Sequence, residues 1–149
     1  MVTKSGILKP DPLAAAEQVI AAHKDEHAWL DAFSSHLDRH RAGHVLAGIL
    51  STWDLSQAET ARLIGISRQA IGKWIDRGAP PDRAEMISDL AAATDLLVHY
   101  VKRDRIPAVV RRPIPAKNNV SIVDLLERGD TQLILATCRE MFDFQQVHG

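Results

Sequence analysis

Hydrophobic residues recur at helical spacing along most of this chain, and the clearest pattern lies between residues 55 and 78. Ile64, Ile71 and Trp74 fall where one side of two short helices would meet a core. Polar and basic residues occupy the opposite side of the same stretch. The pattern therefore predicts two short amphipathic helices joined by a tight turn.

Local sequence signals mark the ends of these two helices. Ser56 suits the cap of the first helix, with Glu59 reaching back to it in a capping box. Gly65 suits the left-handed conformation of a sharp stop, and Ser67 suits the cap of the second helix. The turn then comprises residues 65–67. Two helices around such a turn, the second opening with polar and basic residues, form the layout of a DNA-reading helix-turn-helix.

Upstream of this motif, the apolar residues between 13 and 37 recur mainly at three- and four-residue steps. Residues 23–27 are polar all round, so one helix or two fit this stretch equally well. Gly43 is predicted to interrupt the helical pattern. Residues 45–53 then form a helix that packs behind the helix-turn-helix.

Downstream, residues 83–105 form the longest predicted helix, with Asp82 as its cap. Three prolines between residues 106 and 119 favour an extended connection. An apolar face of the long helix is available for pairing two copies of the chain. The residues of this predicted dimer face are Met86, Leu90, Leu97 and Val101.

Two more helices are predicted near the carboxyl end. Ser121 with Asp124 marks the start of one, Gly129 its end, and residues 131–144 form the last. The expected fold class is all-α, with an N-terminal helical bundle that contains the helix-turn-helix and a small helical C-terminal domain. The predicted organisation is a flexible arm over 1–12, a helical region over 13–80 and a helical domain over 81–149.

Charge is unevenly distributed along the chain, although its net value is only -1. Residues 1–61 carry a net -3, residues 62–117 a net +5 and residues 118–149 a net -3. Phosphate attraction depends on the local patch, so the central segment is able to face DNA. The basic side chains between 103 and 117 either extend such a contact or simply keep a proline-rich connection solvated. These are Arg103, Arg105, Arg111, Arg112 and Lys117.

Residues 55–80 resemble the Xre-type, lambda-repressor-like helix-turn-helix. The resemblance rests on Gln57, the Ala61/Gly65 pair, Ile66, Ile71, Trp74, Gly78 and Pro80. It implies that the start of the second helix, Arg68 and Gln69, reads bases, with Lys73 one turn later. It also implies that Gln57 touches phosphate. The complete predicted DNA-binding set is Gln57, Arg62, Ser67, Arg68, Gln69, Lys73 and Arg77.

Residues from about 83 to 144 are similar to the toxin-binding domain of Xre/MbcA/ParS antitoxins. The similarity lies in a long helix ending in Leu-Leu, a proline-broken stretch, the segment Val-Ser-Ile-Val-Asp-Leu-Leu-Glu-Arg-Gly and a final helix. It implies a toxin protein as a possible partner.

Other residues raise the question of metal or catalytic chemistry. The segment 23–27 matches H-x-x-E-H, and His36, His40 and His44 recur every four residues. No third ligand follows at a recognisable spacing, so solvated surface histidines are favoured over a hydrolase site or a zinc site. Cys138 lies in an apolar helical pattern and is expected to be a buried thiol. No catalytic residue, metal or cofactor is predicted.

The sequence therefore predicts a DNA-binding transcriptional repressor, not an enzyme, that acts on double-stranded DNA as a homodimer. No apolar run approaches the roughly 18 residues of a membrane span, and a cytoplasmic location is expected. An antitoxin-type autorepressor is the leading hypothesis. A free-standing repressor without a toxin is the first alternative, and a protein-interaction module that does not read DNA is the second.

Overall fold

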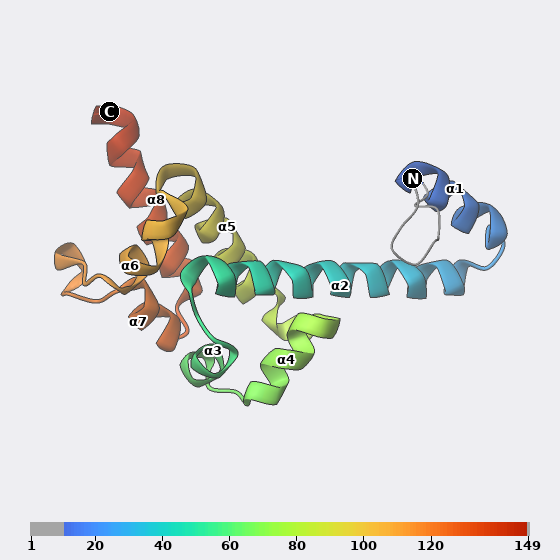
Figure 1. Cartoon of the computed structure of the whole chain (residues 1–149), viewed down its shortest axis with the longest axis horizontal. Coiled ribbons are helices and arrows are strands. Elements are labelled where there is room, and N and C mark those ends of the chain that lie inside the picture. The colour runs from blue at the N-terminus through green and yellow to red at the C-terminus, as the bar shows by residue number, and fades with distance from the viewer. Residues whose placement is uncertain (1–10, 149) are drawn as a thin grey trace. The chain divides into compact units, whose positions relative to one another are not determined.

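The structure is a computed structural model that describes residues 11–148, with side chains described as far as residue 143. It confirms the all-α class, because the described residues contain helices and one isolated antiparallel bridge, between Ile114 and Val120 (Figure 1). The α-helices are α1 (Pro12–Ala22), α2 (His27–Trp53), α3 (Gln57–Ile64), α4 (Arg68–Arg77), α5 (Ala84–Tyr100), α6 (Ile106–Arg111), α7 (Ile122–Glu127) and α8 (Thr131–His148). Three single turns of 3-10 helix lie between them: η1 (Pro81–Arg83), η2 (Arg103–Arg105) and η3 (Pro115–Lys117). Among residues 11–148, no helix is both long and apolar enough to cross a membrane.

The chain divides into two compact units within α2, between Asp38 and Arg39. In the first unit, the carboxylate of Asp11 accepts a hydrogen bond of 3.1 Å from Ala14 N and caps α1. None of the side chains described in residues 11–38 is buried. The ring of Trp29 in α2 stacks on that of His23, which follows α1, and on that of Phe33 in α2, at centroid distances of 3.4 and 5.2 Å.

The predicted interruption of the helix at Gly43 is wrong. The chain breaks earlier, at residues 23–26, and α2 continues through Gly43 to Trp53. The break falls in the stretch that is polar all round, where no apolar stripe holds a helix in place. The helical position of Gly43 requires glycine because the backbone of Trp74 and Ile75 passes close to it.

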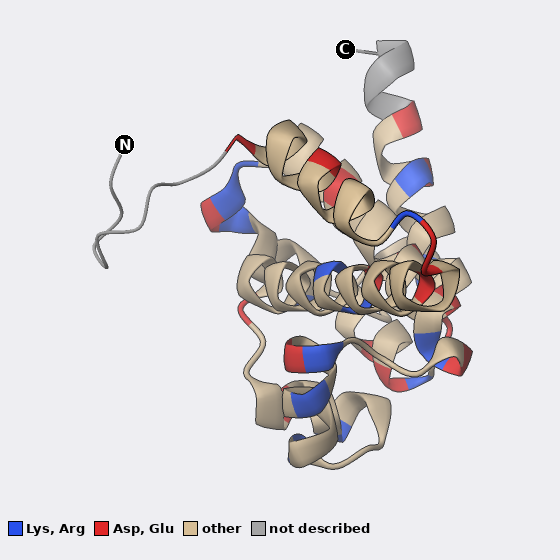
Figure 2. Cartoon of the chain, turned by 90° about the vertical axis from the view of Figure 1, so that its right-hand side faces the viewer, with Lys and Arg blue, Asp and Glu red and all other residues tan. Residues whose placement is uncertain are grey.

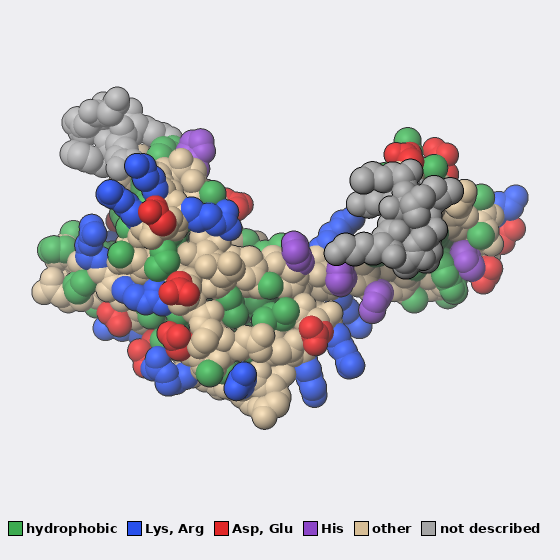
Figure 3. Space-filling model, viewed as in Figure 1, with side chains coloured by type: hydrophobic (Ala, Val, Ile, Leu, Met, Phe, Trp, Pro, Cys, Tyr) green, Lys and Arg blue, Asp and Glu red, His purple; other side chains and the backbone are tan. Residues whose placement is uncertain are grey.

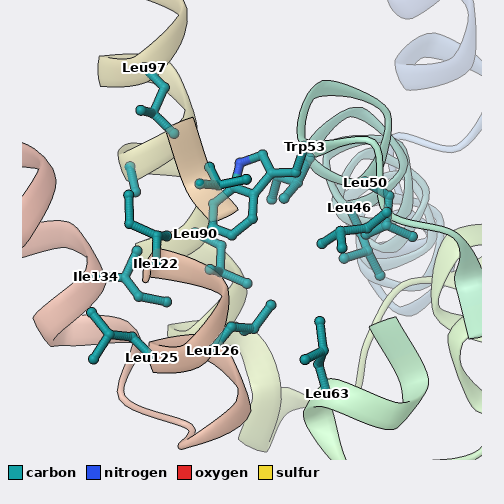
Figure 4. Close-up of a cluster of buried hydrophobic side chains, with 14 of the residues drawn as sticks. Leu46, Leu50, Trp53, Leu63, Leu90, Leu97, Ile122, Leu125, Leu126 and Ile134 are labelled. Carbon is teal, nitrogen blue, oxygen red and sulfur yellow. The ribbon is translucent and has the colours of Figure 1, made fainter. Parts of the chain in front are cut away.

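The second unit, residues 39–149, contains one hydrophobic core to which α2 through α8 all contribute. Figure 4 shows Trp53 of α2 surrounded by leucines and isoleucines from the other helices. Its indole Nε1–H donates a hydrogen bond of 3.0 Å to Thr94 Oγ1, which in turn donates to Leu90 O at 2.7 Å. This chain of bonds satisfies the buried polar side-chain atoms of Trp53 and Thr94. The helix-turn-helix and the C-terminal helices therefore share a single core.

The long helix α5 differs from its prediction at both ends. Asp82 does not cap it but lies in η1, and α5 begins at Ala84. It ends at Tyr100 and not at Arg105, because Val101 is extended, with φ -121° and ψ 139°. The expected extended connection after it is also wrong in part. Residues 106–111 form α6, with a proline in the first turn, where the missing amide proton costs no hydrogen bond.

The predicted dimer face on α5 faces the interior of the monomer. Leu90 and Leu97 are 2% and 0% exposed, and Met86 and Val101 pack against the same core. α5 packs along α8, where the rings of Tyr100 and Phe142 stack 4.6 Å apart. This face is therefore not free to pair two copies.

The carboxyl-terminal segments begin as predicted. Ser121 and Asp124 form a reciprocal capping box at the start of α7, which lowers the pKa of the Asp124 carboxyl. The carboxylate is the form that accepts the Ser121 backbone hydrogen bond, so the cap favours ionisation. Gly129, with φ 76°, follows the end of α7, and α8 begins at Thr131. Cys138 is buried, as expected, and burial raises the pKa of its thiol to about 12.

Three of the basic side chains between residues 103 and 117 make contacts within the protein. Arg111 donates hydrogen bonds of 2.8 Å to the carbonyl oxygens of Trp53 and Asp54, where α2 ends. Arg103 donates to Thr52 Oγ1 at 3.2 Å. The ammonium group of Lys117 lies 3.2 Å from Glu140. These contacts favour a structural role for the three side chains over phosphate binding.

Candidate nucleic-acid interface

The helix-turn-helix is formed by α3 and α4, and its turn lies where the sequence predicted it. Ser56 Oγ accepts a hydrogen bond from Glu59 N at 3.0 Å, which is one half of the predicted capping box. Gly65, with φ 81° and ψ 36°, ends α3. Ser67 Oγ then accepts from Ala70 N at 3.1 Å and caps α4. Each cap satisfies an amide that would otherwise have no partner.

The seven predicted DNA-binding residues are all exposed. Helix α4 buries Ile71 and Trp74, which are 0% and 7% exposed, so that its polar side faces solvent. Gln57 lies next to α4, since its side-chain oxygen would be 3.7 Å from a Cβ placed on Gly72. The structure therefore brings the amino-terminal end of α3 next to the middle of α4.

Part of this set lines a cavity of about 440 Å³ beside α4. Ser67, Gln69, Lys73 and Arg77 contribute to it, together with Arg39 from α2. The other three predicted residues do not line the cavity: Gln57, Arg62 and Arg68. Figure 3 shows the blue side chains that project beside the end of α4, below α2. Sequence reasoning missed Arg39, since it is remote from the motif and only tertiary packing brings it there.

Two glycines set the distance between α2 and α4. A Cβ on Gly43 would lie 2.8 Å from Trp74 O and still closer to Ile75 O. A Cβ on Gly78, where φ is 87°, would lie 2.6 Å from Arg39 O. Real Cβ atoms do not approach backbone atoms this closely, so both contacts require glycine. The backbone of α2 at Arg39 is thereby held against the end of α4.

The cavity has a single sign of charge. Its lining contains three cationic side chains, Arg39, Lys73 and Arg77, and no carboxylate. Within the described residues, none of the three forms a hydrogen bond or an ion pair. Figure 2 shows the Lys and Arg bands on the lowest helices, α3 and α4. Unpaired cations in a concave surface concentrate a positive potential, which attracts phosphate.

The H-x-x-E-H segment does not lie on one face of a helix. His23 ends α1 and His27 begins α2, while Glu26 lies in the intervening turn. The His23 ring contacts the Glu26 carboxylate at 3.2 Å. Among the side chains described, those of residues 11–143, no three His, Cys, Asp or Glu are grouped as a metal site would require.

The fold defines an all-helical protein in which a helix-turn-helix shares its core with a helical carboxyl-terminal half. No protein-family model matches the chain. No curated protein matches its sequence significantly.

Among solved structures, the fold is similar to that of a chain in the M. tuberculosis MbcT–MbcA toxin–antitoxin complex, with a TM-score of 0.55 and 20% sequence identity. The match covers 68% of this chain and 93% of that chain. At the level of the fold, this likeness supports the resemblance of residues from about 83 to 144 to an antitoxin, whereas no family model supports that of residues 55–80 to the Xre-type helix-turn-helix.

Proposed function

We propose that the protein is a sequence-specific DNA-binding repressor of the antitoxin type, with a binding function and no catalytic one. The observation that carries this proposal is the capped amino end of α4, which exposes Arg68 and Gln69 and buries Ile71 and Trp74. A recognition helix presents its first residues to base edges in the major groove. The arrangement of α4 supports that use.

The side chains at this end suit the chemistry of the groove. Arg68 has the planar fork that bonds the two acceptors of guanine, and the amide of Gln69 pairs with adenine. Gln57 and Ser67 lie at the amino ends of α3 and α4, where helix ends favour phosphate. Although Ser67 Oγ accepts the Ala70 amide, its proton remains available for a phosphate oxygen.

The likeness to a chain of a toxin–antitoxin complex supports a toxin protein as the second partner. On this proposal the half of the chain from residue 83 onward binds the toxin, and the repressor controls its own promoter. Regulators of this kind pair two modules on half-sites roughly 34–36 Å apart, so a homodimer is the expected binding species. A free-standing repressor remains the second candidate, because the helix-turn-helix surface supports both equally.

Fluorescence anisotropy with the chain's own promoter DNA and a random duplex tests DNA reading. Arg68→Ala and Gln69→Ala should each cost about 1–3 kcal/mol on the promoter and little on random DNA. Arg139→Ala, an exposed change on α8, is the matched control and should alter neither. Equal losses on both duplexes would show that these residues contact only the backbone. No binding by the unaltered protein would leave the protein-interaction module as the remaining hypothesis.

Co-purification with the product of the neighbouring gene tests the antitoxin part. Capture of that product by the full chain, with relief of its toxicity, is the expected result. Promoter binding without any such capture would favour the free-standing repressor.

A further inference from the structure

We propose that Arg39, Lys73 and Arg77 form a binding site for a phosphate of the DNA backbone, in the part of the cavity that lies toward the carboxyl end of α4 from Arg68 and Gln69. This inference rests on the proposed function and extends it to a residue outside the helix-turn-helix. It assigns to the middle of α2 a direct part in DNA binding.

The position of Arg39 is fixed by packing. Its backbone carbonyl and Cα lie against Gly78, at 2.6 and 2.9 Å from the position of an added Cβ. One turn further along α2, Gly43 packs against the carbonyls of Trp74 and Ile75. Two close contacts, spaced four residues apart, hold α2 in register with α4. The exposed Arg39 side chain consequently lines the same cavity as Lys73 and Arg77.

The charge of the site is only partly explained within the described residues. Three cations converge on the cavity and no carboxylate lines it. The presence of Arg77 alone is explained by its place at the carboxyl end of α4, because a cation there interacts favourably with the helix dipole. Arg39 lies inside α2 but is held beside the same end of α4 by Gly78, and a helix end carries only about half an elementary charge, which does not balance three cations. An anion bound between the three side chains balances their charge.

The reach of α4 identifies the anion. Arg77 lies nine residue steps after Arg68, which corresponds to about 13 Å along the helix. The major groove is roughly 12 Å wide, so a helix that reads bases at its start meets the groove wall near its end. The groove wall is the phosphate backbone. Lys73 and Arg77 then lie on the same side of α4 as Arg39, and the three side chains together reach a backbone phosphate.

The test compares Arg39→Ala with the unaltered full-length protein on promoter and random duplexes, over a range of salt concentrations. Loss of one phosphate contact should weaken binding about three- to tenfold on both duplexes and reduce the salt slope by about one. Arg39→Lys should retain most of the affinity, since lysine also neutralises phosphate. Arg139→Ala should leave affinity and slope unchanged. Circular dichroism should show the same melting temperature for all four proteins, because the Arg39 side chain is exposed.

The outcomes separate this inference from the function on which it rests. If Arg39→Ala binds like the unaltered protein while Arg68→Ala loses promoter affinity, the phosphate site is wrong and the repressor stands. If Arg39→Ala weakens promoter binding alone, Arg39 reads sequence and the site is also wrong. If inorganic phosphate stabilises the unaltered protein but not Arg39→Ala, and DNA affinity is equal, the site binds a free anion instead. If the unaltered protein binds neither duplex, both proposals fail.

Discussion

The substitution Gly43→Ala adds one methyl group that has two opposing effects on stability, one through the intrinsic helix preference and one through tertiary packing. Gly43 lies inside α2, where an alanine stabilises an isolated helix by about 0.8–1.0 kcal/mol relative to glycine. In this protein the added methyl group would lie 2.8 Å from Trp74 O and 2.9 Å from Ile75 C. Both atoms belong to the backbone of α4, so no side-chain rotation relieves the contact. The two effects have opposite signs.

The magnitude follows from the distances. An ordinary carbon contact is about 3.5–4.0 Å, so α2 and α4 must separate by about 1 Å. Overpacking of a buried site costs typically 1–3 kcal/mol, and a backbone obstacle places Gly43→Ala at the upper end of that range. After the helix preference is subtracted, a net loss of about 2 kcal/mol is expected. For a chain of this size that lowers the melting temperature by about 6–8 °C.

Urea denaturation followed by circular dichroism measures this loss. Gly48→Ala is the matched control, because Gly48 lies in the same helix and a Cβ there meets nothing within 4 Å. The control should be unchanged or more stable by up to about 1 kcal/mol. If Gly43→Ala is as stable as Gly48→Ala, the close crossing of α2 and α4 is wrong, and with it the placement of Arg39 beside Lys73.

Three further results are expected. Thr94→Val leaves the buried indole N–H of Trp53 without an acceptor, so the free energy of unfolding measured by urea denaturation should fall by about 1–3 kcal/mol. Substitution of an exposed residue should leave this free energy unchanged. Cys138 should resist a thiol reagent at pH 8 until the protein is unfolded, since its thiol is buried with a pKa near 12; rapid labelling of the folded protein would contradict this. Asp124→Ala should lower stability at pH 7, and the difference in stability from the unaltered protein should fade as the pH falls below about 4. The reason is that a carboxyl with a depressed folded-state pKa stabilises the fold only while it is ionised. A pH-independent difference would show that the charge of Asp124 plays no part.

The local features of the fold were predictable from the sequence because short-range chemistry determines them. A serine that bonds the amide three residues on, as Ser56, Ser67 and Ser121 do, needs nothing from the rest of the chain. The left-handed turn at Gly65 is similarly local. The ends of α3, α4 and α7 therefore lie where the sequence placed them. The exposed face of α4 followed from the same helical period.

The features that depend on tertiary packing were not predictable. Gly43 looks like a helix break in the sequence, but its lack of a side chain allows the backbone of α4 to pack closely against α2. Leu90 and Leu97 were expected to pair two copies and instead pack within the monomer. Arg39 lies well before the motif whose cavity it lines. In each case the deciding contact joins residues far apart in the sequence, which neither propensity nor periodicity encodes.

The shared core has one more consequence, which two deletions test. Removal of residues 118–149 takes six buried side chains out of the core, among them Ile122, Leu126 and Ile134. At about 1.5–3 kcal/mol for each buried side chain, the loss of about 9–18 kcal/mol is comparable to the whole stability of about 5–15 kcal/mol of a typical domain.

This deletion should therefore unfold the helix-turn-helix, rather than leave a DNA-binding fragment. Removal of residues 1–38 takes no described side chain from that core, and the remaining chain should keep its cooperative melting transition. Circular dichroism of both variants measures this. A folded, DNA-binding product of the first deletion would show that the helix-turn-helix does not depend on the C-terminal helices, and that repression and partner binding are separable by truncation.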